Sequence, residues 1–229
     1  GARHYFKAAK VPTFDCDGEQ RLGKKGDGGK WVCNPEEVEA AEDCLVYSIG
    51  SNGDYSFEEA MHELNPGCEI HTFDHTVRAG KEPAYVHHHE VGLGTADEGD
   101  SIRTLSSMVA ELGHANRTIQ ILKIDCEGCE WLTQGEWYGK NFVAQQILVE
   151  LHPQYAGVER LDVDASVPVF GRKDSGHHRF DWHRVQDFFD KLEEHCYVNF
   201  HTEPNLVSER YIATEFSFVR AKLRKDMKC

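Results

Sequence analysis

The chain has 229 residues, of which 40% are hydrophobic and 28% charged, and this composition excludes a disordered, collagenous or low-complexity protein. Its length fits one compact domain better than two. Lys and Arg number 25 against 39 Asp and Glu, which gives a formal net charge of −14, so the surface repels phosphate backbones and a nucleic-acid substrate is disfavoured.

The N-terminal part of the chain differs in character from the rest. Residues 1–43 carry many glycines among charged residues, which predicts an extension made mostly of loop and packed on the core formed by residues 44–229. No run in the chain approaches the roughly 20 apolar residues that span a bilayer, and residues 1–10 lack the apolar segment of a signal peptide. We therefore expect no membrane contact by this segment, which leaves open an anchor or a signal peptide in the full-length protein.

From residue 44 onward, segments typical of strands and helices alternate. The expected strands are residues 44–49, 69–73, 85–91, 119–124 and 146–151. The expected helices are residues 56–64, 101–112 and 183–195. A closing antiparallel pair is expected at residues 197–201 and 212–219. Such alternation predicts an α/β fold, with a mostly parallel central sheet and helices on both faces. A ligand then belongs at the carboxyl ends of the strands.

The chain contains eight cysteines, an even number that is high for its length. Four of them, Cys16, Cys33, Cys44 and Cys68, lie in or beside stretches predicted as loops, where disulfides can staple the extension to the core. We expect an oxidising compartment with most cysteines bridged. A link from Cys33 to Cys44 is favoured, because it would hold the extension beside the first strand. The alternative is a cytosolic protein with free thiols.

Two short motifs bear on the same question. Cys126 and Cys129 form a CxxC pair without a second CxxC, and we interpret them as packing residues or a bridge rather than as a zinc or redox site. Asn116-Arg117-Thr118 is a glycosylation sequon, which agrees with a secretory location, although such triplets also arise by chance.

The first strand ends in the turn Gly50-Ser51-Asn52-Gly53-Asp54, whose small residues let backbone N–H groups approach a nucleotide-like ligand. The turn departs from the GxGxxG pattern, which disfavours a dinucleotide. Asp74 ends the second strand, where an acidic side chain can accept hydrogen bonds from two ribose hydroxyls. Together these residues fit an adenosine ligand without a pyrophosphate, such as S-adenosylmethionine. The alternative is that Asp74 caps a turn with His75 and Thr76.

The fourth and fifth strands also end in polar residues. Asp125 ends an apolar strand, and a carboxylate at this edge of a sheet more often serves a site than the fold. Glu150 and His152 lie two residues apart and point to the same face. Either His152 or a carboxylate removes a proton from an acceptor hydroxyl, or the three side chains hold a divalent ion, Mn²⁺ or Mg²⁺, that lowers the pKa of the hydroxyl. Their convergence favours the metal. A third interpretation is that His152 only caps the chain before Pro153.

These motifs resemble a known enzyme family. From about residue 44 to residue 219 the chain is similar to class I S-adenosylmethionine-dependent methyltransferases. Segments that resemble the FkbM-type family in order and spacing are residues 104–105, 121–130 and 147–152. Segments that resemble a related eukaryotic methyltransferase-like family of the secretory pathway are residues 21–23, 27–33, 47–50 and 56–58. The chain departs from the FkbM pattern at Cys126 and Cys129, where small apolar residues are usual, and this leaves the redox state of that turn open.

The resemblance implies a Rossmann-like sheet, methyl transfer to oxygen, and a methyltransferase domain over residues 44–229. FkbM-type enzymes commonly methylate hydroxyls of sugars or natural products, so a secretory member suggests a glycan acceptor in the Golgi lumen or outside the cell. The alternatives are a small metabolite or a protein side chain as acceptor, or a methyltransferase-like binding module without activity. The expected cofactor contacts are Gly50, Ser51, Asn52, Gly53, Asp74, His75, Thr76, Gly94 and Asp125, and the expected catalytic residues and metal ligands are Asp125, Glu150 and His152.

Three further segments carry less specific patterns. Residues 87–89 are histidines, but neighbouring residues of a strand point to opposite faces, so three in a row cannot all reach one ion, and we interpret them as part of an ordinary strand. Residues 171–181 follow the fifth strand and predict either acceptor contacts or a solvated, mobile loop. The basic run at residues 220–228 is interpreted as a solvated tail.

Overall fold

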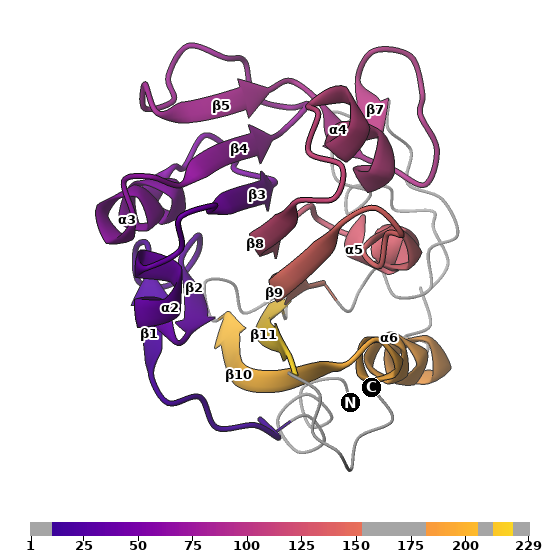
Figure 1. Ribbon diagram of the computed structural model, residues 1–229. Helices are drawn as coiled ribbons and strands as arrows, with labels where there is room; N and C mark the ends of the chain where they lie inside the picture. Colours follow the sequence, from indigo (N-terminus) through magenta and orange to yellow (C-terminus); the bar gives the residue numbers. More distant parts are fainter. Residues whose placement is uncertain (1–10, 153–181, 206–212, 222–229) are drawn as a thin grey trace.

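The computed structural model describes residues 11–152, 182–205 and 213–221 of the chain. A seven-stranded sheet lies at its centre (Figure 1), in the order β10 (Tyr197–Asn205), β11 (Ala213–Arg220), β9 (Val143–Leu151), β8 (Thr118–Ile124), β3 (Leu45–Ile49), β4 (Glu69–Phe73) and β5 (Val86–His89). The strands from β9 to β5 pair in parallel, whereas β11 pairs antiparallel with both β9 and β10. The predicted α/β fold with a closing antiparallel pair is confirmed.

Helices cover both faces of this sheet. Figure 1 shows α2 (Pro35–Glu39) and α3 (Ser56–Leu64) on one side, and α4 (Leu105–Glu111), α5 (Glu130–Thr133) and α6 (Trp182–Glu194) on the other, with the short 3₁₀ helix η1 (Gln134–Glu136) directly after α5. None of the described helices is long and apolar enough to cross a membrane. The helices shield a sheet whose parallel strands would otherwise expose apolar side chains on two faces.

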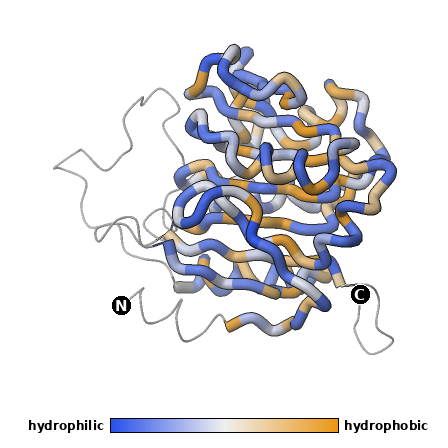
Figure 2. Tube along the Cα trace, turned by 90° about the vertical axis from the view of Figure 1, so that its left-hand side faces the viewer, coloured by the Kyte–Doolittle hydropathy of each residue, from blue (hydrophilic) through white to orange (hydrophobic). Residues whose placement is uncertain are grey.

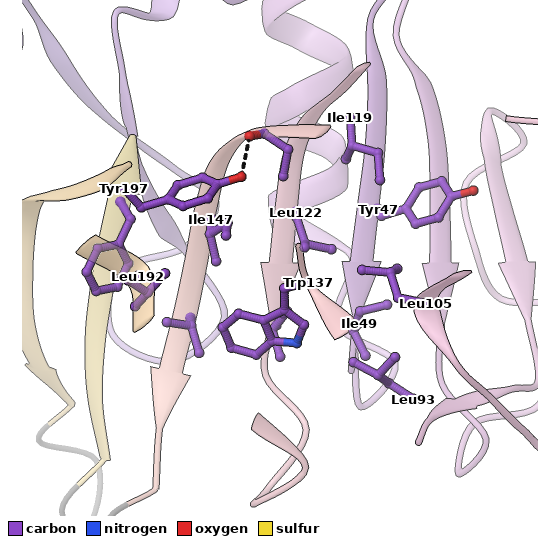
Figure 3. Close-up of a cluster of buried hydrophobic side chains, with 14 of the residues drawn as sticks. Tyr47, Ile49, Leu93, Leu105, Ile119, Leu122, Trp137, Ile147, Leu192 and Tyr197 are labelled. Atoms are coloured by element: carbon purple, nitrogen blue, oxygen red, sulfur yellow. Dashed lines mark hydrogen bonds between the residues drawn. The ribbon is translucent and has the colours of Figure 1, made fainter. Parts of the chain in front are cut away.

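Side chains that alternate along the central strands build a core on each face. In β3, Leu45, Tyr47 and Ile49 belong to one core and Val46 to the other, and all four are buried. Figure 3 shows the first core, in which Tyr47 and Ile49 lie near Leu105 of α4. Along the described chain, hydrophobic stretches alternate with hydrophilic ones (Figure 2). This burial on both faces is why the strands are visible as short apolar runs in the sequence.

The helix predicted at residues 101–112 begins later than expected. Thr104 is the N-cap of α4, because its side-chain oxygen accepts a hydrogen bond from the Ser107 N–H at 3.1 Å. The Thr104 N–H in turn donates to Asp97 Oδ1 at 2.8 Å. The two residues before the cap form β7 (Ile102–Arg103), which pairs in parallel with β6 (Gly92–Leu93). This strand pair prevents the helix from starting at residue 101.

Residues 11–43 are largely irregular, as predicted, but they contain a hairpin that the sequence did not reveal. β1 (Glu19–Leu22) pairs antiparallel with β2 (Lys30–Cys33), and β2 packs against β9 and β11. The Gln146 side chain of β9 accepts a hydrogen bond from the Cys33 N–H at 2.9 Å and donates one to the Cys33 carbonyl at 2.8 Å. The hairpin is therefore anchored to the sheet by hydrogen bonds between its backbone and a side chain of β9. A domain boundary at residues 43–44 stays a prediction.

Disulfides join elements that are neighbours in the fold. Cys16 is bonded to Cys33, Cys44 to Cys68 and Cys126 to Cys129, and Cys196 is also disulfide-bonded. The prediction that most cysteines are bridged is confirmed, but the predicted link from Cys33 to Cys44 is wrong. Cys44 and Cys68 precede the adjacent parallel strands β3 and β4, and the Glu69 N–H donates to the Cys44 carbonyl at 2.8 Å. Strand pairing therefore makes Cys68 the near partner of Cys44.

Replacing both Cys44 and Cys68 with alanine should lower the free energy of unfolding by about 3 kcal/mol, because the bridge closes a loop with a sequence separation of 24. The matched control is the double alanine variant of Cys126 and Cys129, whose separation of 3 restrains the unfolded chain much less. Urea denaturation measures both losses. Equal losses in the two variants would contradict this entropic explanation.

Candidate active site

The turn after β3 lies at the edge where the carboxyl ends of the parallel strands meet. Gly50, Asn52 and Gly53 have positive φ angles of 79°, 49° and 73°. A Cβ atom at Gly50 would overlap the carbonyl oxygen of Asp125, so only glycine lets this turn pass against the end of β8. The buried Lys123 ammonium donates a hydrogen bond to the Gly50 carbonyl at 2.7 Å. The turn is thus fixed by both its backbone and a neighbouring strand.

Asp74 follows β4 and holds the same turn through both carboxylate oxygens. Oδ2 accepts hydrogen bonds from the N–H groups of Ser51 at 2.9 Å and Asn52 at 2.8 Å. Oδ1 accepts from the N–H of Thr76 at 2.9 Å and from its hydroxyl at 2.6 Å. Burial opposes ionisation, but these donors outweigh it and hold the pKa of Asp74 below its usual value. Asp74 is therefore a turn cap in this structure, and its contact with a ribose stays a prediction.

The other predicted cofactor contacts lie close to the ends of β4 and β6. His75 and Thr76 are exposed. Gly94 follows β6, and its N–H donates to the Arg103 carbonyl at 2.9 Å. A Cβ atom at Gly94 would overlap the Ile102 side chain, so the close packing of β6 on β7 requires a glycine there. This packing explains the glycine, and contact between Gly94 and a cofactor stays a prediction.

The structure brings Asp125, Glu150 and His152 together, with one polar atom of each within 4.8 Å of the others. It also places beside them two residues that sequence reasoning missed. The Lys30 side chain is 1% exposed, and its ammonium lies 3.0 Å from the Asp125 carboxylate and 2.6 Å from the Glu215 carboxylate. The Glu150 carboxylate lies 3.9 Å from the same ammonium. A buried lysine therefore bridges three strands at this edge.

The signal that could have found Lys30 is the alternation in β2. Lys30 and Val32 lie two residues apart and both are buried, whereas Trp31 between them is partly exposed. This pattern places Lys30 on the inner face of the strand. The carboxylates that receive it come from β8, β9 and β11, and no local pattern in the sequence indicates that these strands approach the hairpin.

The charges in this cluster offset one another. Burial disfavours the Lys30 ammonium, but the acidic side chains around it, Asp125 first and then Glu215, outweigh this effect and raise its pKa. Burial likewise opposes ionisation of Asp125, but the nearby positive charges, Lys30 first, hold its pKa well below its usual range. Burial, followed by the charges of Asp125 and Glu215, raises the pKa of Glu150 to about 9. At neutral pH, Lys30 and Asp125 are therefore charged and Glu150 is a neutral acid.

His152 is held as a charged ring by two acidic residues that follow β8, Glu127 and Glu130, the second of which begins α5. Its Nδ1 lies 3.0 Å from Glu130 Oε1, and its Nε2 lies 3.5 Å from Glu127 Oε2. Burial lowers the pKa of His152, but these carboxylates, Glu130 first, outweigh burial and raise it to about 10. At neutral pH both ring nitrogens therefore carry a proton, and neither has a lone pair with which to remove a proton from an acceptor.

The predicted divalent cation has a competitor in place. The Lys30 ammonium lies within 3.9 Å of both the Asp125 and the Glu150 carboxylate and supplies positive charge there. An ion bound by Asp125, Glu150 and His152 would have to displace this ammonium together with the protons on Glu150 and His152. The three side chains lie close enough together to share an ion, and the divalent cation stays a prediction that has to compete with Lys30.

Of the three segments with less specific patterns, the structure describes residues 87–89 in full. Residues 87–89 lie on β5, and His88 Nδ1 is 3.2 Å from the Tyr55 hydroxyl while His89 Nε2 is 2.9 Å from His71 Nδ1. The run therefore reaches different partners, in agreement with an ordinary strand. Residues 171–181 and residues 222–228 of the basic run lie outside the described residues.

Two features define a Rossmann-like fold of the class I methyltransferase type. The antiparallel strand β11 lies beside β9 in the sheet, and a glycine turn lies at the edge where the parallel strands end. A family model described as a methyltransferase domain matches residues 1–220. The chain belongs to this methyltransferase-domain family.

Two curated relatives have the name "Probable methyltransferase-like protein 24". The chain is 30% identical over 141 residues to the Homo sapiens protein, a match that covers 56% of this chain and 37% of the relative. It is also 30% identical over 141 residues to the Rattus norvegicus protein, with 56% of this chain and 38% of the relative covered. The chain thus spans less than half the length of the curated relatives it matches.

Solved structures give weaker likenesses. The fibrillarin pre-rRNA processing protein of Methanococcus jannaschii has a TM-score of 0.46 and 10% identity, over 93% of this chain and 87% of that chain. The 16S rRNA (adenine(1408)-N(1))-methyltransferase from Catenulisporales acidiphilia has a TM-score of 0.38 and 11% identity, over 90% of this chain and 100% of that chain. The assignment of the fold rests on the strand order and the family match, and not on these scores.

Replacing Lys30 with methionine should lower the free energy of unfolding by about 3 to 5 kcal/mol, because the Asp125 and Glu215 carboxylates would stay buried without their cation. The control Glu150→Gln should not lower it at neutral pH, because a folded pKa of about 9 means that Glu150 takes up a proton on folding, and glutamine removes the cost of that uptake. Urea denaturation of both variants makes the comparison. A Lys30→Met protein as stable as Glu150→Gln would show that the cluster does not carry these charges.

The free energy of unfolding should fall as the pH rises from about 6.5 to about 10. His152 titrates near 6.5 when unfolded and near 10 when folded, so its stabilising contribution is complete below 6.5 and is lost as the pH passes through 10. His152→Gln, which does not titrate, should flatten this part of the profile. Chemical denaturation at a series of pH values provides the measurement, and an identical slope in both proteins would refute a charged His152.

Proposed function

We propose that the chain is an S-adenosylmethionine-dependent O-methyltransferase that acts on a hydroxyl of a glycan or sugar, in the secretory lumen or outside the cell. The observation that carries the proposal is the edge at which Asp74 fixes the glycine turn of residues 50–53 beside Asp125, in a chain of the methyltransferase-domain family. Family membership supports methyltransferase activity in general. The cofactor, the oxygen acceptor and the compartment are the proposed parts.

The residues at this edge fit S-adenosylmethionine. The turn at residues 50–53 has no Cβ atom at Gly53, where the surrounding space is open, which allows close approach of a ligand to the backbone. Asp74 would receive the ribose hydroxyls, and Ser51, Asn52, His75, Thr76 and Gly94 would surround the cofactor. When bound, S-adenosylmethionine supplies an electrophilic methyl group on a cationic sulfonium. The ionised Asp125 offers an opposite charge to such a cation.

Catalysis at this edge is proposed to depend mainly on positioning. A general base works best with a pKa near the working pH. Glu150 and His152 hold their protons at neutral pH, and Asp125 has a pKa too low for an effective base. We therefore assign to Asp125 the orientation of the acceptor hydroxyl, and to Glu150 and His152 the maintenance of the charge and geometry around it. Lys30 positions the Asp125 carboxylate.

The surface charge and the disulfides support a glycan acceptor. A net charge of −14 disfavours nucleic acid. Disulfides form and persist in oxidising compartments such as the secretory lumen, where glycans are abundant sources of hydroxyl groups. Asn116 of the sequon is exposed in a turn, with a φ angle of 68°, so its side chain is accessible to glycosylation. A small metabolite or a protein side chain with a hydroxyl would use the same edge.

One observation favours a second candidate, a methyltransferase-like binding module without activity. The five hydrogen bonds to Asp74 from Ser51, Asn52 and Thr76 come from the protein itself, so the carboxylate is satisfied without a ribose. The two candidates differ in whether the edge binds S-adenosylmethionine.

Titration calorimetry should show that wild-type protein binds S-adenosylmethionine, and Asp74→Ala should weaken the binding free energy by about 1 to 3 kcal/mol, because it removes a charged acceptor and releases the turn. The control is Asp43→Ala, which removes a carboxylate that is 68% exposed before β3 and should leave the binding unchanged. No binding by the wild-type protein would leave only the binding module. An unchanged dissociation constant in Asp74→Ala would remove Asp74 from the site.

Transfer of a radiolabelled methyl group to a panel of glycans, metabolites and peptides should label a glycan hydroxyl. Added Mn²⁺ or Mg²⁺ should change turnover by less than about twofold, because Lys30 occupies the place of the predicted ion. Labelling confined to metabolites or peptides would reject the glycan acceptor. Turnover that requires added Mn²⁺ would contradict the role given to Lys30.

A further inference from the structure

A second cluster of metal-binding side chains lies at the opposite end of the sheet from the glycine turn. Glu69 is the first residue of β4, His71 lies two residues further along, and His114 follows α4. Glu69 Oε1 lies 3.0 Å from His71 Nε2 and 3.1 Å from His114 Nε2, and one ligand atom of each residue lies within 4.8 Å of the others. Both imidazoles are buried, while the Glu69 side chain is 36% exposed and gives the cluster access to solvent.

Each of these side chains is held by a further partner on its other polar atom. His71 Nδ1 lies 2.9 Å from His89 Nε2, and His114 Nδ1 lies 2.8 Å from the Tyr47 hydroxyl. The second oxygen of the carboxylate accepts a hydrogen bond from Arg117 at 2.5 Å. Metal-bound histidines are oriented in this manner, by a hydrogen bond to the ring nitrogen that does not bind the ion. The cluster is therefore preorganised around the atoms that face one another.

The donor atoms of the cluster suit a metal ion. A carboxylate oxygen of Glu69 faces one ring nitrogen of His71 and one of His114. Carboxylate oxygen and imidazole nitrogen are ligand types that zinc takes in proteins.

We propose that Glu69, His71 and His114 bind a zinc ion, with water in the fourth position. Zinc lies about 2.0 to 2.2 Å from nitrogen and oxygen ligands in a tetrahedral arrangement, which separates the ligand atoms by roughly 3.3 Å. The observed separations of 3.0 and 3.1 Å are close to this value. The ion joins β4 to the segment between α4 and β8. Because it lies at the amino end of β4, it is a structural site that is separate from the proposed cofactor edge.

Zinc content and a cobalt spectrum test this site. The protein is loaded with Zn²⁺ alone, dialysed against metal-free buffer and analysed by inductively coupled plasma mass spectrometry, and we expect about one zinc ion per chain. Co²⁺ in place of zinc should give the visible absorption bands of a four- or five-coordinate ion. Wild-type protein that retains no zinc and shows no such bands would overturn the proposal, and the cluster would then be a hydrogen-bond network only.

Two variants and a control assign the ligands. His71→Gln and His114→Gln should each reduce retained zinc by at least about tenfold. His87→Asn removes an exposed ring that stacks on His71 at 4.9 Å, and it should retain zinc as the wild type does. Circular dichroism confirms folding, and if one glutamine variant does not fold, the other variant and the wild-type cobalt spectrum decide. Equal retention in all variants, or loss in His87→Asn alone, would overturn the assignment.

Discussion

The Lys30 ammonium lies among three acidic side chains, one directly after β8 and the others in β9 and β11, and the proposed active edge depends on this contact. Burial of neighbouring carboxylates without a cation is costly, because the charges lose their hydration and repel one another. Lys30 removes this cost by pairing with Asp125 and Glu215, while Glu150 takes up a proton. A residue of the N-terminal hairpin therefore sets the charge of the site. In the proposed function, the hairpin contributes to the site as well as to the packing of the domain.

The two ends of the sheet use buried charge differently. At the carboxyl end, Asp74 and Lys123 hold a glycine turn by hydrogen bonds to its backbone, and Lys30 balances the acids beside it. This arrangement leaves a shaped edge whose polar groups are already fixed, which favours catalysis by orientation. At the amino end, Glu69 and two histidines face one another with their outer atoms held by hydrogen bonds. That arrangement favours an ion that stabilises the fold.

Sequence patterns predicted those strands and helices whose buried and terminating residues form a local pattern in the sequence. The strands of the parallel sheet are short apolar runs because both of their faces are covered, and α3 has the predicted bounds Ser56–Leu64 because Asn65, Pro66 and Gly67 end it. The start of α4 was misplaced because the Thr104 cap and the pairing of β7 with β6 compete with the helix. The convergence of Asp125, Glu150 and His152 was predictable, because parallel strands end at one edge.

The features that sequence reasoning missed depend on contacts between distant segments. Lys30 lies far along the chain from Asp125 and Glu215, and only the packing of β2 on β9 and β11 brings it to them. The same holds for His114, which follows α4 and contacts Glu69 at the start of β4. Disulfide pairing followed the adjacency of β3 and β4 rather than the spacing of cysteines along the chain. The local periodicity of the sequence does not indicate which distant segments come into contact.

Hydrogen–deuterium exchange of the wild-type protein, with and without saturating S-adenosylhomocysteine, tests most directly whether the carboxyl edge is the cofactor site. Slower exchange is expected in peptides that cover residues 50–54, 74–76 and 123–126, because the ligand would order the glycine turn and the ends of β4 and β8. Residues 108–117 at the opposite end of the sheet should be unaffected. Unchanged exchange at residues 50–54 and 74–76 in the presence of the ligand would contradict a cofactor site at this edge.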